Sequence, residues 1–515
     1  MSTRLVIGVA VLRPGMRMLL DQLGVAYEGI VRWDELDPAR YSAVIVNRSP
    51  DAGQLAALRE YLRGGGAVLD AGYLLRAISR RGFAQRRVRW FLPDADDPMF
   101  GTIGLADLHQ TIWCHPDASY CDGLVHLTAA DGGHVAYLPF DLHRAVVNHR
   151  SVRRTFHSPW SRDPDEIVGR ISKGGIRRVV EGALIWLHQQ RGLPYLHRWY
   201  FPEDARSVFC YRIDSDYGTR AQVLALHEHA ARHGIPLTWF LHVAAHQEWL
   251  SLFNEFEGDE TALHCYRHRT FNGGEENAAN IALGLAMMKD CGMQVEGFAA
   301  PNGFWNHALA AAVAAAGLLY SSEFSLAYDD VPFRPWSRGD LLPTLQVPVH
   351  PVCIGSLKRV KAPQEAMARY FRRAVDHAMA GNLPALLYHH PGHEGWDVVE
   401  DTFLHVRARG IPAITMGDYA RWWTRRNSMR HAAETADGRI AIRYTRPDPA
   451  VLLAARTPDG RVAFVRGESV ALDGLQWREP HPADPDGPEG IKRIRRFSLD
   501  RVRHSIEDYN ARARQ

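Results

Sequence analysis

The chain has 515 residues, of which 46% are hydrophobic and 23% are charged, and its formal net charge is +3. This composition is that of an ordinary globular protein, which excludes a disordered chain and a membrane protein. Because the net charge is small and the basic residues are dispersed, we expect no nucleic-acid partner. The length exceeds what one hydrophobic core usually holds, so we expect roughly two to four domains.

The cysteines and the N-terminus bear on where the protein works. Six cysteines occur without a Cys-x-x-Cys spacing, which indicates reduced thiols rather than a disulfide scaffold. The apolar run 4–10 lacks a small-residue cleavage site, so we interpret it as a first strand and not as a signal peptide. The longest apolar run, 308–320, is shorter than the about 20 residues that cross a bilayer. We therefore predict a cytoplasmic protein without a transmembrane segment, and the oligomeric state stays open.

Residues 1–150 alternate short apolar runs with amphipathic ones, which predicts a doubly wound parallel sheet covered by helices. The expected strands are 5–10, 42–47, 67–70 and 134–139, and the expected helices are 16–23 and 54–62. This segment resembles the glutamine-amidotransferase-like, flavodoxin-like domains. The catalytic members of that group carry a cysteine in the turn after the strand that here is 67–70. No cysteine lies near that turn, so we expect a scaffold or substrate-orienting domain without a nucleophile.

The remaining chain divides into three expected parts. Residues 151–204 predict a helical connector, in which Asp163-Pro164-Asp165-Glu166 starts a helix that ends near residue 190. Residues 205–428 show a second strand–helix alternation, with strands at 236–241, 297–299 and 385–388 and helices at 308–316 and 366–380. Residues 429–515 predict a small antiparallel β domain, a proline- and aspartate-rich stretch at 481–488 and a C-terminal helix. We interpret the basic run 492–496 as a solvated helix face.

Two pairs of polar residues stand out within 205–428. Asp214 and Asp216 follow the apolar run 208–211, and we expect them at the carboxyl end of a buried strand, where α/β enzymes bind ligands. If that strand stays extended, both carboxylates face one side. The three-residue gap between His264 and His268 predicts that both lie on one face of a helix or helical turn, within reach of one metal.

Other histidines show the same spacing, since the chain has 26 of them. We interpret these further pairs, His229/His233, His242/His246 and His389/His393, as surface or core histidines. One carboxylate with two imidazoles can hold a divalent metal, and a second carboxylate and a late histidine then remain for proton transfer. Hydrolysis of an amide or ester by metal-activated water requires this division.

Over 205–425 the chain resembles the polysaccharide deacetylase superfamily (NodB homology, carbohydrate esterase family 4), which has a distorted (β/α) barrel. Its Asp-x-Asp form is similar to the branch of intracellular peptidoglycan-deacetylase-like and allantoinase-like members. The resemblance implies that Asp214 is the general base and that Asp216, His264 and His268 hold the metal. It also implies a general acid in the segment Tyr388-His389-His390-Pro391, where we favour His390, with His389 as the alternative. We expect zinc, and another divalent transition metal such as iron stays open.

The substrate-binding residues follow from the same resemblance. The third family motif often begins with an arginine that pairs with the catalytic aspartate, but here it is Ala299-Ala300-Pro301-Asn302-Gly303, so Arg212 or Arg267 would have to supply that charge. We expect the backbone N–H of Tyr217 to stabilise an oxyanion, and Pro301 and Asn302 to form a turn that lines the pocket. The tryptophans that are candidates to stack on sugar rings are Trp305, Trp336 and Trp396.

We therefore predict a metal-dependent hydrolase that removes N-acetyl groups from hexosamine residues. The expected substrate is an N-acetylated glycan or, given no export signal, a sugar precursor made inside the cell. Two alternatives stay open. One is a small-amide, allantoinase-like hydrolase on the same barrel, and the other is a non-catalytic glycan-binding protein.

Overall fold

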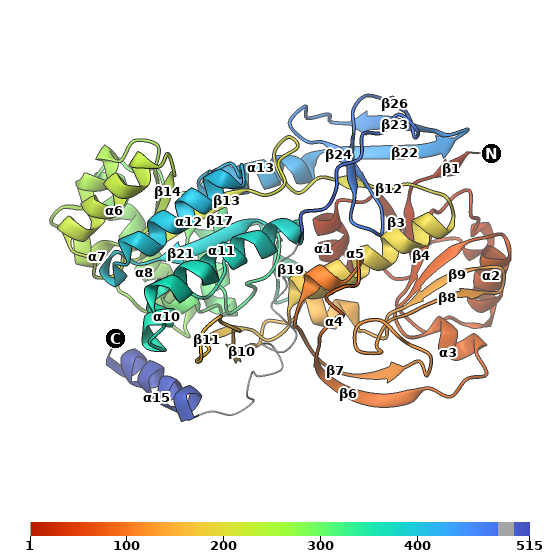
Figure 1. Ribbon diagram of the computed structural model, residues 1–515, viewed down its shortest axis with the longest axis horizontal. Helices are drawn as coiled ribbons and strands as arrows, with labels where there is room; N and C mark the ends of the chain where they lie inside the picture. The colour runs from red at the N-terminus through yellow and green to blue at the C-terminus, as the bar shows by residue number, and fades with distance from the viewer. Residues whose placement is uncertain (1, 483–498, 515) are drawn as a thin grey trace. The chain divides into compact units, whose positions relative to one another are not determined.

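The computed structural model describes residues 2–482 and 499–514, which belong to two compact units (Figure 1). Unit 1 comprises Met1–Asn148, Ile171–Asp204 and Trp423–Pro485, and unit 2 comprises His149–Arg170, Ala205–Trp422 and Asp486–Gln515. The basic run 492–496 and most of the stretch 481–488 lie outside the described residues. Among the described residues, no helix combines the length and apolarity needed to cross a bilayer.

A six-stranded sheet of order β3-β2-β4-β5-β9-β8 is at the centre of unit 1. Five strands run parallel, and β8 pairs with β9 in the antiparallel direction. Strand β4 and the first three residues of β5 are apolar, and both strands are buried along their whole length, as expected of parallel strands covered by helices. The bounds are β2 (Ile7–Val9), β3 (Tyr27–Gly29), β4 (Ala43–Val46), β5 (Ala67–Asp70), β8 (His126–Ala130) and β9 (Gly133–Tyr137).

Helices pack on this sheet, the longest being α5 (Lys173–Gln190), which is buried along most of its length and crosses the sheet (Figure 1). The hydrogen bond between His188 Nε2 and Ser42 Oγ, 3.0 Å, ties α5 to the start of β4. The other helices are α1 (Pro14–Leu23), α2 (Ala52–Arg63), α3 (Leu74–Ile78) and α4 (Leu142–Val146), with the short turns η1 (Trp33–Glu35) and η2 (Gly101–Ile103).

The turn after β5 is held by Asp70. Its carboxylate accepts hydrogen bonds from the backbone N–H groups of Tyr73, Leu74 and Leu75 at 2.6–2.9 Å. These contacts satisfy the free donors at the start of α3. The resembling catalytic domains carry a cysteine nucleophile in this turn. Here the turn is instead held by the Asp70 carboxylate, which has a structural role.

The C-terminal strands of unit 1 form antiparallel sheets with strands from distant parts of the chain. One sheet has the order β1-β22-β23-β26, and another has the order β12-β24-β25. The bounds are β1 (Thr3–Arg4), β12 (Tyr195–Arg198), β22 (Arg430–Ala436), β23 (Arg439–Thr445), β24 (Leu453–Arg456), β25 (Val462–Val465) and β26 (Ser469–Ala471). A separate antiparallel pair is β6 (Ala84–Phe91) with β7 (Ala106–Cys114).

The predicted helix start at 163–166 is wrong. Residues Asp165–Gly169 form strand β11, antiparallel to β10 (Ser151–Thr155), and the helix begins only at Lys173. The Asp165 carboxylate does not cap a helix but binds the Arg153 guanidinium at 2.5 Å and His504 Nδ1 at 3.0 Å. These partners are distant in sequence, so local helix-start signals did not reveal them.

A curled sheet of seven parallel strands, of order β20-β17-β16-β15-β14-β13-β21, is the core of unit 2. Within the described residues β20 and β21 are its two edges and do not pair, so the sheet is an open half-barrel. The bounds are β13 (Phe209–Asp214), β14 (Leu237–His242), β15 (Glu260–Cys265), β16 (Gly297–Phe298), β17 (Tyr320–Ser321), β20 (Leu345–Gln346) and β21 (Ala385–His389); β18 (Trp336–Ser337) and β19 (Asp340–Leu341) form a separate short pair.

Helices follow most of these strands, as in a (β/α) arrangement. Helices α11 and α12 lie side by side next to β21 (Figure 1), joined by ion pairs of Asp376 with Arg409 and of Arg372 with Asp401. The bounds are α6 (Arg220–Arg232), α7 (Val243–His246), α8 (Gly274–Asp290), α9 (His307–Ala315), α10 (Ile354–Arg359), α11 (Gln364–Ala380), α12 (Trp396–Ala408), α13 (Met416–Ser428) and α15 (Leu499–Arg514), with η3 (Leu250–Glu255), η4 (Pro301–Gly303) and η5 (Pro391–His393).

Candidate metal centre

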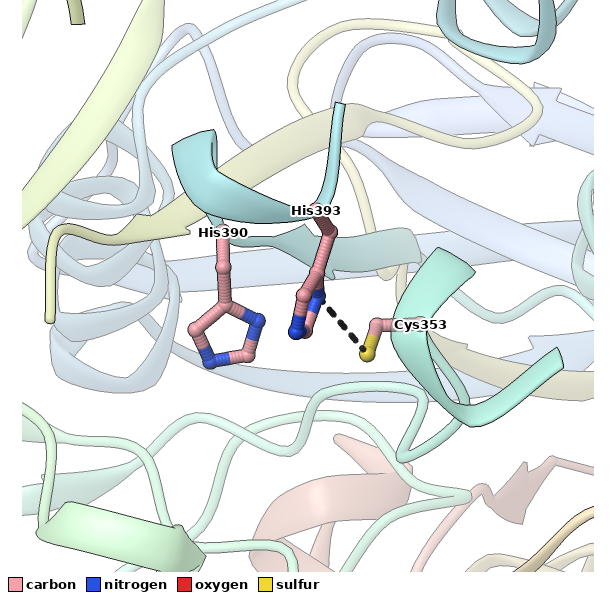
Figure 2. Close-up of side chains that lie close together, drawn as sticks. All are labelled: Cys353, His390 and His393. Carbon is pink, nitrogen blue, oxygen red and sulfur yellow. Dashed lines mark hydrogen bonds between the residues drawn. The ribbon is translucent and has the colours of Figure 1, made fainter. Parts of the chain in front are cut away.

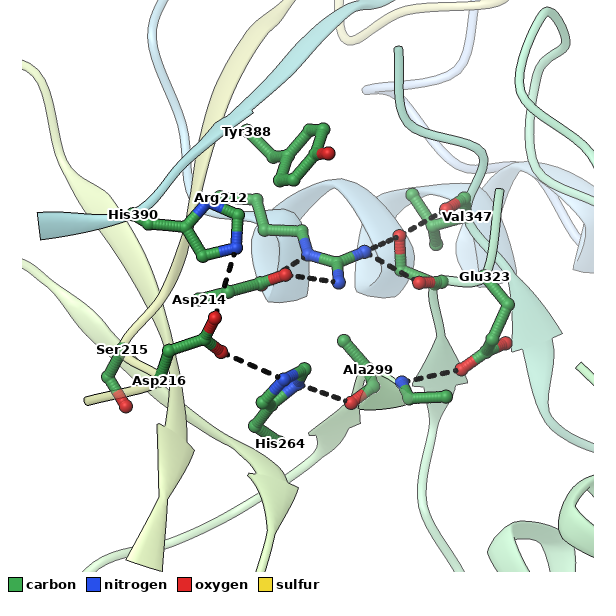
Figure 3. A network of polar contacts seen from close by, with 12 residues as sticks. Arg212, Asp214, Ser215, Asp216, His264, Ala299, Glu323, Val347, Tyr388 and His390 are labelled. Atoms are coloured by element: carbon green, nitrogen blue, oxygen red, sulfur yellow. Dashed lines mark hydrogen bonds and ion pairs between the residues drawn. The ribbon is translucent and has the colours of Figure 1, made fainter. Parts of the chain in front are cut away.

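The carboxyl ends of the unit 2 strands meet at one edge of the sheet, and Asp214 is the last residue of β13, which lies between β14 and β21. Its two carboxylate oxygens accept hydrogen bonds from the Arg212 guanidinium at 2.6 and 2.8 Å (Figure 3). Residues two apart on a strand face the same side, so the pairing follows from the strand itself. Arg212 is fully buried and Asp214 is 4% exposed.

Arg212 and Arg267 are the two arginines that the sequence offers as partners of the catalytic aspartate, and Arg212 is the one that pairs with Asp214. Arg267 is exposed, whereas Arg212 also donates to the Ser322 carbonyl at 2.6 Å and lies over the rings of Phe240 and Tyr388. Burial raises the pKa of Asp214, but the adjacent guanidinium outweighs this effect and lowers it below the ordinary value.

Asp216 lies beyond the end of the strand in left-handed backbone conformation, with φ of 39°. The strand does not stay extended through Asp216, so the condition under which both carboxylates would face one side is not met. The chain turns at Ser215, and this turn directs the Asp216 carboxylate toward two histidines. Its Oδ1 lies 3.3 Å from His264 Nε2 and 3.1 Å from His268 Nε2.

The two histidines do not lie on a helix, contrary to the sequence prediction. His264 is in β15 and His268 is in the bend that follows the strand. They nevertheless converge, because the strand ends at the same edge as β13 and the bend folds His268 back over Asp216. The potential ligand atoms of Asp216, His264 and His268 all lie within 4.8 Å of one another.

This group fits a divalent metal ion in its chemistry as well as in its spacing. His264 Nδ1 lies 2.7 Å from the Ala299 carbonyl oxygen (Figure 3), and this contact leaves Nε2 directed at Asp216. Burial raises the pKa of Asp216, but the imidazoles of His390, His264 and His268 hold it well below the ordinary value. The carboxylate is therefore ionised, as a ligand must be.

Two further histidines hold the turn that carries Asp216. The Ser215 hydroxyl lies 2.9 Å from His246 Nε2 and accepts the backbone N–H of His242 at 2.9 Å. His242 Nδ1 lies 3.0 Å from the Asp216 carbonyl oxygen. Both histidines of the His242/His246 pair are buried core residues and not ligands, as the sequence analysis expects, and they support the backbone of the candidate metal ligand.

His390 faces the site and His389 does not. His390 Nε2 lies 3.4 Å from Asp216 Oδ2 (Figure 3). His389 is fully buried in β21, in register with Ile213, so it points to the opposite side of the sheet from Arg212 and Asp214. Burial lowers the pKa of His390, but the carboxylate of Asp216 and the Cys353 thiolate outweigh this effect and raise it to about 9.

The predicted substrate-binding residues lie on loops that follow the strands. Tyr217 directly follows Asp216, and its ring is 67% exposed and lies 5.9 Å from the His268 ring. Pro301 is buried, and Asn302 is exposed in left-handed conformation, φ 57°, within η4. Trp305 is buried against His307 and His149. Among the described residues, no contact joins its ring to Asp216, His264 or His268.

Some polar residues near this edge carried no signal in the sequence. Glu323 is buried, accepts the backbone N–H of Ala300 at 3.2 Å, and has a pKa raised by burial to about 7. Cys353 and His393 lie beside His390. They come from separate segments, so only the fold brings them together. All six cysteines are free, in line with the expected reduced thiols.

Comparison with known proteins gives only remote structural likenesses. No protein-family model matches the chain, and no curated protein matches it. Similar solved structures include one described as a polysaccharide deacetylase from Mycobacterium smegmatis, with 17% identity over 44% of this chain and 92% of that chain, TM-score 0.38. The Puue allantoinase has 17% identity over the same shares, TM-score 0.39. A family 4 carbohydrate esterase from Streptomyces lividans in complex with acetate has 15% identity over 41% and 92%, TM-score 0.29. The functional argument therefore rests on the site itself.

Proposed function

We propose that the protein is a metal-dependent hydrolase that removes N-acetyl groups from hexosamine residues of a glycan or glycan precursor. The observation that carries this proposal is the grouping of Asp216, His264 and His268 between two separate proton-transfer groups, Asp214 and His390. A site for hydrolysis needs three donors to one metal, a base and an acid, and each is supplied by a different side chain.

Asp216, His264 and His268 would hold the metal, zinc or another divalent transition metal. When bound, this ion supplies Lewis acidity to the carbonyl group and lowers the pKa of water. Asp214, kept ionised by Arg212, accepts the proton of the attacking water. His390 donates a proton to the departing amine, and the backbone N–H of Tyr217 contributes a hydrogen bond to the oxyanion.

The Arg212–Asp214 pair weighs against the non-catalytic alternative. That alternative was attractive because Ala300 stands where the resembling family often has an arginine. The bidentate bond at 2.6 and 2.8 Å provides a guanidinium to the same aspartate from its own strand. A purely binding protein has no need to hold a buried, charged carboxylate beside a metal site.

Substrate contacts are proposed for the loops around the metal centre. Tyr217 is exposed at the site, and Pro301, Asn302 and Trp305 form the segment that follows β16. These groups suit a sugar ring, because aromatic faces stack on it and amides bind its hydroxyls. The strand order of the unit 1 sheet supports a flavodoxin-like domain that serves as a scaffold. The cytoplasmic location stays a prediction, to be tested by cell fractionation.

The test is acetate release from N-acetylated oligosaccharides and nucleotide-linked N-acetylhexosamines by zinc-loaded protein. We expect wild type to release acetate and Asp214→Asn and His390→Gln to lose about 100-fold or more in rate, since acid or base catalysis contributes about 10² to 10⁴. His233→Ala, a histidine of the same type outside the site, is the matched control. Release of amine from small ureides, with none from acetylated sugars, would instead select the allantoinase-like alternative.

A further inference from the structure

A second group of metal-type ligands lies beside the first. Cys353 precedes α10, His390 follows β21, and His393 ends η5 (Figure 2). Their potential ligand atoms lie within 4.8 Å of one another, and Cys353 Sγ is 3.9 Å from His393 Nδ1. None of the three belongs to the Asp216, His264 and His268 group.

The local backbone holds this second group in place. The His393 N–H donates to the His390 carbonyl at 3.0 Å, which closes the turn between the two histidines. The ring of His393 sits against Gly355, where an added Cβ would lie only 2.3–2.7 Å from three ring atoms. The absence of a side chain at residue 355 therefore creates the space that brings His393 to Cys353.

The donor types select the ligand. A thiolate with two imidazoles suits zinc or a similar soft transition metal and is unsuited to magnesium or calcium. Tetrahedral zinc, with bonds of about 2.0–2.3 Å, places its ligand atoms about 3.3–3.7 Å apart. The 3.9 Å separation of Cys353 Sγ and His393 Nδ1 is close to this range. Side-chain rotations that move these two atoms by less than about 1 Å would bring them to the zinc-binding distance.

His390 connects the two groups through its two ring nitrogens. Its Nε2 lies 3.4 Å from Asp216 Oδ2. Its Nδ1 is buried and makes no hydrogen bond of normal geometry, although the Cys353 sulfur interacts with the ring. A buried polar atom without a partner is costly, and here it belongs to the ring that lies between Asp216 on one side and Cys353 on the other. A metal ion at Cys353 and His393 would give this nitrogen a partner.

We propose that Cys353, His393 and Nδ1 of His390 form a second zinc site, and that zinc bound there inhibits hydrolysis. Zinc binding takes the Cys353 sulfur as thiolate and displaces the proton on Nδ1 of His390 to solvent. Zinc at Nδ1 occupies the side chain that the proposed function uses as its proton donor, so His390 no longer protonates the departing amine. This inhibitory effect rests on the proposed function, whereas the zinc site itself does not.

The site is tested with cobalt(II), which replaces zinc and gives a near-ultraviolet charge-transfer absorption only when a thiolate is a ligand. Metal-free wild type titrated with cobalt should develop this band and bind one equivalent more than Cys353→Ser. The double variant His264→Ala/His268→Ala should keep the band, because the first group contains no cysteine. No band in wild type, or an undiminished band in Cys353→Ser, would overturn the proposal.

Two controls keep the test specific. Cys265→Ser removes the cysteine next to His264 and should leave the band unchanged. Gly355→Ala retains all three ligands but should displace the His393 ring, and we expect the cobalt affinity at this site to fall at least about 10-fold. Equal affinity in Gly355→Ala and wild type would contradict the geometry, provided that circular dichroism shows both proteins folded.

Inhibition is measured separately, as acetate release against added zinc beyond the first equivalent. Wild type should lose activity as the second equivalent binds, whereas Cys353→Ser should keep the activity that it had before the addition. If no preparation releases acetate, the proposed function fails while the cobalt band still decides the site. If acetate is released and excess zinc has equal effects on both proteins, the inhibitory role fails and the proposed function stands.

Discussion

Replacing Arg212 tests the charge pair on which the site is built. In Arg212→Met, a side chain of similar length keeps the packing but leaves the Asp214 carboxylate buried without its partner. The guanidinium is fully buried and binds both carboxylate oxygens at 2.6 and 2.8 Å. At an effective dielectric constant of about 20, unit charges roughly 4 Å apart attract by about 4 kcal/mol. Loss of one partner of a buried pair costs about 3–5 kcal/mol.

We therefore expect Arg212→Met to lower the free energy of unfolding of unit 2 by about 3–5 kcal/mol at pH 7. The assay is urea unfolding at equilibrium, followed by tryptophan fluorescence and circular dichroism. The chain forms two compact units, which can unfold in separate transitions. The change in the free energy of unfolding is therefore measured on the transition that the variant shifts. Arg220→Met, an exposed arginine at the start of α6, is the matched control and should change stability by less than about 0.5 kcal/mol.

A double-mutant cycle separates the pair from general packing. Arg212→Met/Asp214→Leu removes both charges, and a buried pair replaced by apolar residues costs much less than one broken pair. The double variant should therefore lose less stability than the sum of Arg212→Met and Asp214→Leu, by more than about 2 kcal/mol. Costs that add within about 0.5 kcal/mol would refute the reasoning, because independent sites behave that way.

Three further predictions concern the support of the site. Burial raises the pKa of Glu323 from 4.5 to about 7, so the stability present below pH 4.5 is lost as the pH rises to about 7. At about 1.4 kcal/mol per pH unit the loss of stability is about 3 kcal/mol. Thermal unfolding of wild type between these pH values should show this loss, and an equal loss in Glu323→Gln would contradict its assignment to Glu323. Ser215→Ala removes the hydroxyl that holds the Asp216 turn, and zinc affinity by competition with a chelator should fall about 10- to 100-fold; unchanged affinity would argue against this support. Gly303→Ala places Cβ 2.4 Å from the Phe324 ring at φ of 60° and should cost about 2–4 kcal/mol, more than Gly317→Ala, which has a similar φ and open space; equal costs would contradict this.

The sequence predicted the parts of the fold that depend on local pattern. Apolar runs such as 67–69 and 385–388 are strands because burial on both faces needs uninterrupted hydrophobic residues. It failed where distant partners decide the conformation. Asp165 follows a proline and looks like a helix start, but its ion pair with Arg153 and its contact with His504 stabilise a strand.

The candidate site was predictable as a set of residues and not as a geometry. Asp216, His264, His268 and His390 were selected by type, order and resemblance, and the fold brings them together. The expected helix for the two histidines was wrong, because convergence comes from the end of β15 and the bend after it. Cys353 had no signal, and His393 had only the common spacing of the His389/His393 pair. The two residues are 40 positions apart in sequence and meet only when α10 and η5 pack together.

The central claim is that Asp216, His264 and His268 hold a metal ion. We would measure it by elemental analysis after dialysis against zinc, comparing wild type, His264→Ala/His268→Ala and Cys353→Ser. Wild type should contain one equivalent more than the double histidine variant, and Cys353→Ser, which keeps Asp216, His264 and His268, should still contain one equivalent. Equal zinc content in wild type and in the double histidine variant would contradict the account.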